Sequence, residues 1–136
     1  ERYLVDTNIL VYGVDRNARF HDRARSLIEQ GFREGARFAL AHQNLIEFVA
    51  VLTRAYRVRV RDAVRDSEAF ALHFELVAPL PTTFDTWLAL MRNRAKSSYP
   101  FDAYLAATML DNGIRRIVTA NVKDFAGVGL EEVIGI

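Results

Sequence analysis

Asp6 is an isolated charge in an apolar stretch of this 136-residue chain. It is the only charged residue between Tyr3 and Val14, and Thr7 and Asn8 follow it directly. A buried carboxylate must be hydrogen-bonded, paired or bound to a cation, because burying a bare charge costs too much free energy. Asp-Thr-Asn after an apolar strand therefore predicts a ligand site at a strand end of an open α/β sheet. The alternative is a turn in which Asn8 caps the next helix.

Two further acids lie in apolar surroundings. Glu47 is the only charge in the segment 45–52. By helical periodicity it lies roughly opposite the apolar residues of that segment, which is also where an ordinary surface residue would lie. Asp102 opens an apolar helical segment, where an acid caps backbone N–H groups and suits the positive end of the helix dipole. The same location can also hold a carboxylate at the rim of a site, so both interpretations stay open.

A polar group follows the β-branched segment 114–119, with Thr119, Asn121 and Asp124 at its carboxyl end. A polar turn would explain it. If this strand lies beside the first one, however, the turn faces Asp6, because adjacent strands are only about 4.8 Å apart. Oxygen ligands from separate elements suit a hard divalent cation such as Mg²⁺ or Mn²⁺. Such a cation can activate water and neutralise charge on a phosphate.

The elements that must position these residues alternate along the chain. Hydrophobic periodicity and turn residues predict strands at 2–6, 37–41, 75–80, 114–119 and 132–136. Helices are expected at 8–15, 21–31, 43–56, 61–74, 82–96 and 101–112. Strands that alternate with helices predict an α/β fold with a parallel sheet and helices on both faces. No linker or repeat interrupts the pattern, so we expect a single domain over residues 1–136.

Composition excludes several classes of protein. The chain is 51% hydrophobic and 26% charged, as in ordinary soluble domains, and it has no cysteine for disulfides, thiolate metal sites or a cysteine nucleophile. No apolar run reaches the roughly 18 to 20 residues of a membrane span. No basic segment precedes the first apolar run, so a signal peptide is not expected. A cytoplasmic protein is the simplest interpretation.

Arginines are concentrated in one region although the net charge is only +1. Arg54, Arg57, Arg59, Arg61 and Arg65 fall within twelve residues, opposed only by Asp62. Arginine makes planar, bidentate contacts with phosphates and carboxylates, so this cluster predicts a binding surface for one of them. A solvated helix face is the alternative.

Four motifs together resemble the PIN-domain family. They are Leu-Val-Asp-Thr-Asn at 4–8, Glu47 in an apolar helix, Phe-Asp-Ala at 101–103, and Val-Thr-Ala-Asn-Val-Lys-Asp-Phe at 118–125. The length and the lack of appended domains most resemble the stand-alone VapC-type toxins of toxin–antitoxin pairs. The resemblance implies a Rossmann-like, three-layer α/β/α fold with a parallel sheet of four to five strands.

The resemblance also implies a Mg²⁺- or Mn²⁺-dependent endoribonuclease that cleaves RNA phosphodiesters with a metal-activated water. It implies the catalytic acids Asp6, Glu47, Asp102 and Asp124, with Asp6, Asp102 and Asp124 as metal ligands and Asn8, Thr119 and Asn121 in support. Asn121 occupies the usual Thr-x-Asp position, and Asp124 is the nearest carboxylate, so either can complete the site. A homodimer and a cognate antitoxin are implied as well. We expect Arg54, Arg57, Arg59 and Arg61 to contact RNA or an acidic partner segment.

Two other classes of protein remain open. Asp-Thr-Asn resembles the start of a haloacid-dehalogenase-type phosphatase, but Asn8 stands where that class has its second Asp. A response-regulator receiver would need an acidic pair after the first strand and an acceptor Asp after the third. The seven glycines are scattered and form no phosphate-binding loop. The other class is a non-catalytic RNA- or partner-binding module that keeps the fold.

Overall fold

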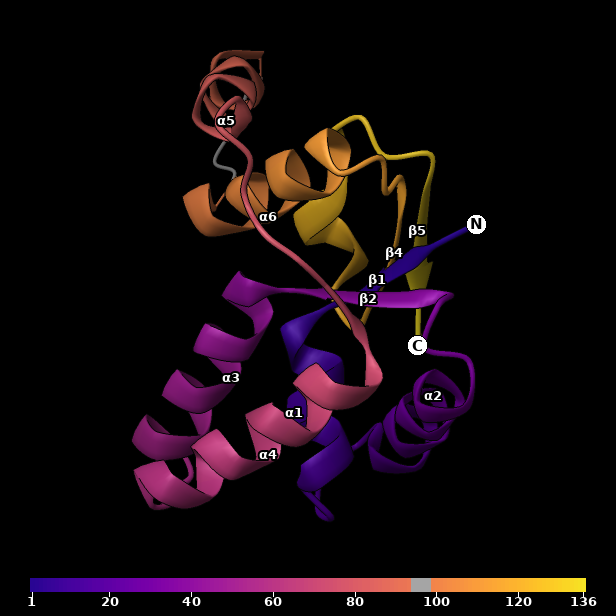
Figure 1. Cartoon of the computed structure of the whole chain (residues 1–136), viewed down its shortest axis with the longest axis vertical. Coiled ribbons are helices and arrows are strands. Elements are labelled where there is room, and N and C mark those ends of the chain that lie inside the picture. Colours follow the sequence, from indigo (N-terminus) through magenta and orange to yellow (C-terminus); the bar gives the residue numbers. More distant parts are fainter. Residues whose placement is uncertain (94–98) are drawn as a thin grey trace.

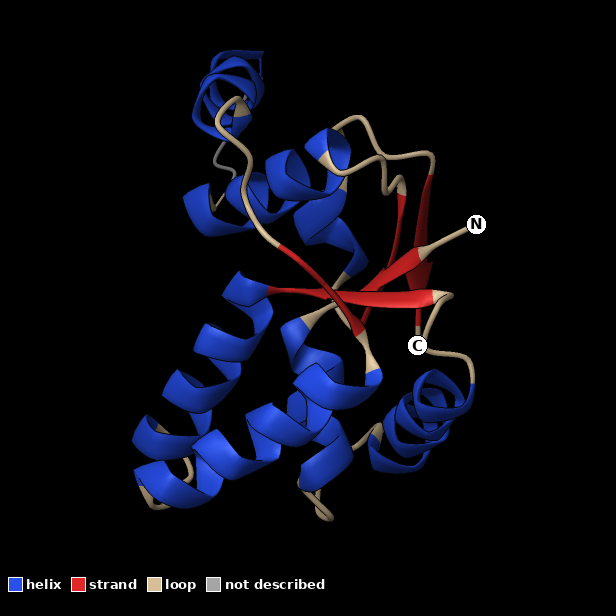
Figure 2. Cartoon of the chain, in the orientation of Figure 1, coloured by secondary structure: helices blue, strands red, loops and turns tan. Residues whose placement is uncertain are grey.

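A parallel five-stranded sheet forms the centre of the computed structural model, which describes residues 1–93 and 99–136 (Figures 1 and 2). Its strands are β1 (Tyr3–Val5), β2 (Phe38–Ala41), β3 (Glu75–Val77), β4 (Arg116–Thr119) and β5 (Glu132–Gly135). Their order is β3-β2-β1-β4-β5, and every pair is parallel. The expected α/β class and parallel sheet are therefore confirmed.

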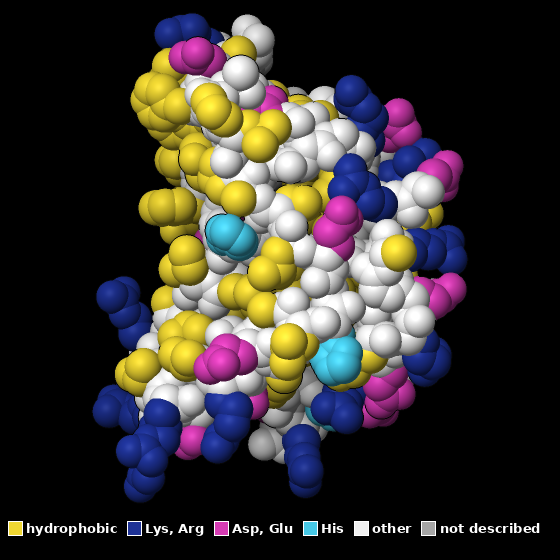
Figure 3. All heavy atoms as spheres, in the orientation of Figure 1, with side chains coloured by type: hydrophobic (Ala, Val, Ile, Leu, Met, Phe, Trp, Pro, Cys, Tyr) yellow, Lys and Arg dark blue, Asp and Glu magenta, His cyan; other side chains and the backbone are white. Residues whose placement is uncertain are grey.

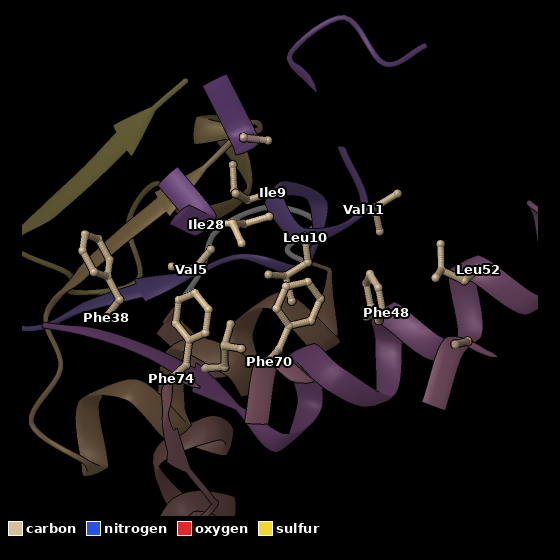
Figure 4. Packing of buried hydrophobic residues seen from close by; sticks show 13 residues of the cluster. Val5, Ile9, Leu10, Val11, Ile28, Phe38, Phe48, Leu52, Phe70 and Phe74 are labelled. Carbon is tan, nitrogen blue, oxygen red and sulfur yellow. The ribbon is translucent and has the colours of Figure 1, made fainter. Parts of the chain in front are cut away.

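Helices cover both faces of the sheet (Figure 1). Residues of α1 (Thr7–Val14), α2 (His21–Arg33), α3 (His42–Arg54) and α4 (Val60–His73) pack on one face around Val5, Phe48 and Phe70 (Figure 4). Residues of α6 (Pro100–Asp111) and the 3₁₀ helix η1 (Val122–Phe125) pack on the other face around Leu4. Leu4 and Val5 point to opposite cores because successive side chains of a strand alternate.

Most element boundaries differ from the prediction by one to three residues, most notably in three places. Helix α1 begins at Thr7, so Asp6 is its N-cap, and the alternative in which Asn8 caps this helix is wrong. Strand β3 ends at Val77 rather than at residue 80; Pro79, just beyond it, has no N–H for the ladder. The helix expected at 82–96 is α5 (Thr83–Asn93), and residues 94–98 lie outside the described part of the chain.

Helix α5 packs chiefly against α6 and protrudes at one end of the molecule (Figure 1). Asp111, at the end of α6, accepts hydrogen bonds from the hydroxyls of Thr82, Thr83 and Thr86 at 2.8–2.9 Å. Partial burial acts to raise the pKa of Asp111, but the three donors outweigh it and hold the pKa below its ordinary value. Within the described residues, no helix is long and apolar enough to cross a bilayer.

Candidate active site

Asp6 lies at the carboxyl end of the central strand, between α1 and β4. Strand β1 pairs with β4, as the sequence suggested, and the Asp6 backbone N–H donates to Val118 O at 3.0 Å. Both carboxylate oxygens accept hydrogen bonds, Oδ1 from the Thr7 backbone N–H at 2.8 Å and Oδ2 from Thr119 Oγ1 at 2.7 Å. The carboxylate is therefore held rigidly by elements from both ends of the sequence.

The electrostatics at Asp6 disfavour a bare charge. The residue is only 8% exposed. Burial raises the pKa of Asp6 to about 6, against the lowering effect of the hydrogen bonds from Thr119 and Thr7, and nearby Glu47 and Asp124 raise it further. An opposite charge beside these carboxylates would relieve both effects.

Glu47 faces Asp6 from α3. It is half-buried, and its Oε1 accepts a hydrogen bond from Thr7 Oγ1 at 3.1 Å. Thr7 also accepts a bond from Asn44 Nδ2 at 3.1 Å. The interpretation of Glu47 as an ordinary surface residue is therefore wrong. Sequence reasoning missed the contact to Thr7 and Asn44; the available signal was a polar Asn one helical turn before Glu47.

Asn8, Thr119 and Asn121 form a network behind Asp6. Thr119 is fully buried, and besides donating to Asp6 its Oγ1 lies 3.4 Å from Asn8 Nδ2 and 3.0 Å from the Asn121 backbone N–H. Asn8 Oδ1 accepts from the Ala120 backbone N–H at 3.2 Å. These contacts join α1 to the end of β4 and fix the turn that follows it.

Asp124 and Asn121 lie side by side, but they are not equivalent. Asn121 is exposed and its Nδ2 donates to Asp124 Oδ2 at 2.7 Å. Asp124 is half-buried and lines the cavity beside Asp6. The geometry brings the carboxylate of Asp124 into the cavity and leaves Asn121 behind it.

A cavity of about 380 Å³ brings the four predicted acids together. It is lined by Asp6, Glu47, Asp102 and Asp124, with Thr7, Asn8, Val11, Tyr12, Val51 and Tyr56 completing the wall. The carboxylate oxygens of these acids are the atoms that could bind a metal, and oxygen ligands suit Mg²⁺ or Mn²⁺ rather than a soft metal. In the described part of the chain, no three acidic or histidine side chains lie close enough to form a ready-made metal site.

A second cavity, of about 310 Å³, lies between α5 and α6 and has a different character. It is lined by Phe84, Trp87, Pro100, Phe101 and Tyr104, which we call the aromatic face. Phe84 stacks on Trp87 with ring centroids 5.6 Å apart. Hydrophobic side chains follow this side of the molecule from α5 toward α3 (Figure 3).

The predicted arginine cluster lies at the junction of α3 and α4. Arg54, Arg57, Arg59 and Arg61 are all exposed. Tyr56, which lines the acidic cavity, lies among them in the sequence. Figure 3 shows basic side chains along the lower edge of the molecule, over this junction. None of these arginines is among the residues that line the cavity.

Comparisons with known proteins agree with this geometry. The PIN domain family model matches residues 3–129. The chain is 25% identical over 134 residues to "Ribonuclease VapC24" of Mycobacterium tuberculosis, covering 95% of this chain and 92% of that protein. This match confirms the resemblance to VapC-type proteins inferred from the four motifs.

Solved structures share the fold. The Mycobacterium tuberculosis VapC20 toxin, which is described as cleaving the sarcin–ricin loop, matches with a TM-score of 0.67 and 20% identity, over 85% of this chain and 86% of that one. VapBC2 from Rickettsia felis, bound to a promoter DNA fragment, matches with a TM-score of 0.73 and 15% identity, over 100% of this chain and 99% of that one. With a family model that spans nearly the whole sequence, the chain belongs to the PIN-domain family.

Proposed function

We propose that the protein is an endoribonuclease, the toxin of a toxin–antitoxin pair, which hydrolyses phosphodiester bonds in RNA. The observation that carries the proposal is the convergence of Asp6, Glu47, Asp102 and Asp124 on one cavity at the carboxyl ends of β1 and β4. The similarity to a curated VapC ribonuclease supports the substrate class. We further propose that residues 1–136 form one domain that acts in the cytoplasm.

The acids would hold Mg²⁺ or Mn²⁺ through Asp6, Asp102 and Asp124. When bound, such a cation would activate water and neutralise charge on the phosphate. The chain's own contribution is orientation. Asp6 is held by two hydrogen bonds, and Glu47, with one oxygen engaged by Thr7, would use the other to orient the attacking water and accept its proton.

Cleavage assays test the activity. Asp6→Asn keeps the shape of the side chain and removes its charge, so we expect RNA cleavage to fall by orders of magnitude while the protein stays folded. EDTA should abolish cleavage by the wild type. Glu68→Gln, an exposed change on α4, serves as the control and should cleave normally. Equal cleavage by wild type and Asp6→Asn would refute the catalytic site.

The same assay separates the rival functions. A phosphatase would hydrolyse a small phosphate monoester such as p-nitrophenyl phosphate and leave RNA intact. A non-catalytic module would bind RNA without cutting it, with or without a divalent cation.

Thermal melting tests the metal site without a substrate. A cation that binds only the folded chain stabilises it by about 2.7 kcal/mol at 100 times its Kd, which is several degrees in Tm. Asp6→Asn and Asp102→Asn should each lose most of the response to Mn²⁺. Asp102 lies in the first turn of α6, after the N-cap Tyr99, where an acid stabilises the helix through its dipole. If that were its only role, Asp102→Asn would leave the response to Mn²⁺ intact. No shift of the wild-type melt with Mn²⁺ or Mg²⁺ would refute the metal site.

We propose that Arg54, Arg57, Arg59 and Arg61 contact RNA phosphates. Their exposure, and their closeness in sequence to Tyr56 of the cavity wall, support this role. Each lost phosphate contact lowers the salt dependence of binding, because fewer counterions are released. Replacing Arg57, Arg59 and Arg61 together by Gln should therefore weaken RNA binding and flatten its salt slope. An unchanged slope would indicate an acidic protein segment as the partner, or a solvated surface.

We also propose a cognate antitoxin that covers the acidic cavity, and a homodimer that forms through the aromatic face. One solved structure that shares the fold is a toxin–antitoxin complex from Klebsiella pneumoniae. Phe84 is 60% exposed and Phe101 56%, and monomeric proteins rarely leave contiguous apolar patches of this kind uncovered. A second copy of the chain would bury them.

Light scattering tests the dimer at tens of micromolar. Phe84→Ser should yield a monomer. The control is Leu72→Ser on α4, where the side chain is 83% exposed but outside the aromatic face. A wild-type monomer, or equal effects of the two substitutions, would contradict this dimer.

A further inference from the structure

A chain of hydrogen bonds runs from the start of α3 to Glu47. Asn44 is fully buried one turn before Glu47, and its Oδ1 accepts from the Ala41 backbone N–H at 2.8 Å. Its Nδ2 lies 3.1 Å from Thr7 Oγ1. Thr7 Oγ1 in turn lies 3.1 Å from Glu47 Oε1. A buried amide in α3 is thus connected to a carboxylate in the candidate active site through one hydroxyl of α1.

The direction of this chain follows from donor and acceptor chemistry. The Ala41 backbone N–H can only donate, so Asn44 must face it with its oxygen, which turns the donor Nδ2 toward Thr7. Thr7 Oγ1 accepts that bond and keeps a single proton. Glu47 Oε1 is the better acceptor for this proton, because it is a carboxylate oxygen and, at 3.1 Å, lies closer to Thr7 Oγ1 than the backbone carbonyl oxygen of Asn44 does at 3.5 Å.

We infer that Asn44 and Thr7 are positioning residues, which hold the Glu47 carboxylate in the orientation that RNA hydrolysis requires. This inference rests on the proposed function. The Asn44 amide caps the first turn of α3 and also directs the Thr7 hydroxyl, so one buried group fixes both the start of the helix and the orientation of its acid. Neither residue needs to touch RNA for this role.

Three substitutions separate orientation from simple packing. Thr7→Val keeps the shape of the side chain and removes the hydroxyl, whereas Thr7→Ser keeps the hydroxyl. Asn44→Asp keeps the oxygen that caps α3 but replaces the Nδ2 donor with an acceptor, which draws the Thr7 proton away from Glu47.

An oriented hydrogen bond to a charged group is worth about 10- to 100-fold in rate, so Thr7→Val and Asn44→Asp should lower kcat by that factor. KM for a fixed RNA oligonucleotide should stay unchanged, and Thr7→Ser should recover most of the loss.

A double-mutant cycle tests whether Thr7 acts through Glu47. In a Glu47→Ala background, Thr7→Val should cause no further loss of residual cleavage. Additive losses would overturn the inference, as would a Thr7→Val variant with wild-type kcat or one that alters only KM.

Melting temperatures test the hydrogen-bond chain independently of activity. Thr7→Val should lower the Tm more in the wild type than in Glu47→Ala, because the Thr7–Glu47 bond exists only in the first. Additive Tm shifts would show that Thr7 and Glu47 do not form this hydrogen bond, and would overturn the inference. If the wild type never cleaves RNA but the Tm shifts are non-additive, the hydrogen bonds among Asn44, Thr7 and Glu47 exist but the proposed function is wrong. The catalytic role of these hydrogen bonds would then be wrong as well.

Discussion

The burial of Asp6 makes a quantitative prediction for Asp6→Asn in the absence of a divalent cation. The folded protein holds this carboxyl at a pKa of about 6, whereas its ordinary value is 3.8. That difference corresponds to about 3 kcal/mol of destabilisation once the group is ionised. Asparagine carries no charge, so the substitution removes this penalty.

The substitution also removes one hydrogen bond. Asn can accept through only one atom, so it cannot satisfy both the Thr7 N–H and the Thr119 hydroxyl, at a cost of about 1 kcal/mol. We therefore expect Asp6→Asn to be more stable than the wild type by about 2 kcal/mol at neutral pH, or roughly 5–10 °C in Tm.

The gain depends on pH with a definite sign. Because its folded pKa is raised, Asp6 binds its proton more tightly in the folded than in the unfolded chain. Below pH 3.8 the Asp6 carboxyl is protonated in both the folded and the unfolded chain, so the folded state carries no ionisation penalty and the stabilising contribution of the proton is fully present. The penalty grows, and that contribution is lost, as the pH rises to about 6. The advantage of Asp6→Asn should therefore vanish or reverse near about pH 4 and reach its full size above pH 6.

Urea denaturation in EDTA, near about pH 4 and above pH 6, measures the difference in the free energy of unfolding between Asp6→Asn and the wild type. The exposed change Glu68→Gln on α4 should shift the free energy of unfolding by less than about 0.5 kcal/mol at either pH. An Asp6→Asn variant that is less stable than the wild type at neutral pH would refute the reasoning, and so would a gain that does not change with pH.

Three further predictions concern other residues. Asp124→Ala should abolish the Mn²⁺-induced rise in Tm while Asn121→Ala only weakens it, because Asp124 lines the cavity; equal losses would contradict this assignment. Arg57 has a φ of +56°, so the free energy of unfolding of Arg57→Gly should be about 1 kcal/mol higher than that of Arg57→Ala. At Arg61, which is helical, the glycine variant should instead be the less stable of the two. Asp111→Ala should lower the free energy of unfolding by about 1–2 kcal/mol in urea titrations, because three hydroxyls lose their acceptor, and an unchanged midpoint would contradict that role.

The fold was predictable because its signals are local. Apolar strands such as β4, with turn residues at their ends, alternate with amphipathic helices, and this alternation permits few topologies. The end of β3 was less clear, since Ala78 and Leu80 continue the apolar pattern beyond Val77 and only the prolines among them mark where the ladder stops. Packing of α5 on α6 rather than on the sheet is a tertiary outcome that helical periodicity does not encode.

The candidate site was predictable in its acids but not in its connections. Asp6 and Glu47 are conspicuous because each is a lone charge in an apolar segment. The contacts of Thr7 and Asn44 depend on how α1 crosses α3, which no local pattern specifies. Likewise, whether Asp124 or Asn121 reaches the cavity depends on which side chain the short η1 helix directs toward it, and no local pattern specifies that.

The pairing of β1 with β4 has a consequence for biosynthesis. Asp6 and Asp124 lie near opposite ends of this sequence, yet both belong to one cavity. Contacts between such distant residues form late, because a long loop must close before they gain free energy. A nascent chain that still lacks β4 and η1 has therefore not assembled its four acids, and on the proposed function it cannot cleave RNA. The timing of sheet completion would therefore delay the onset of cleavage, and with it the need for an inhibiting partner protein, until this segment has been made.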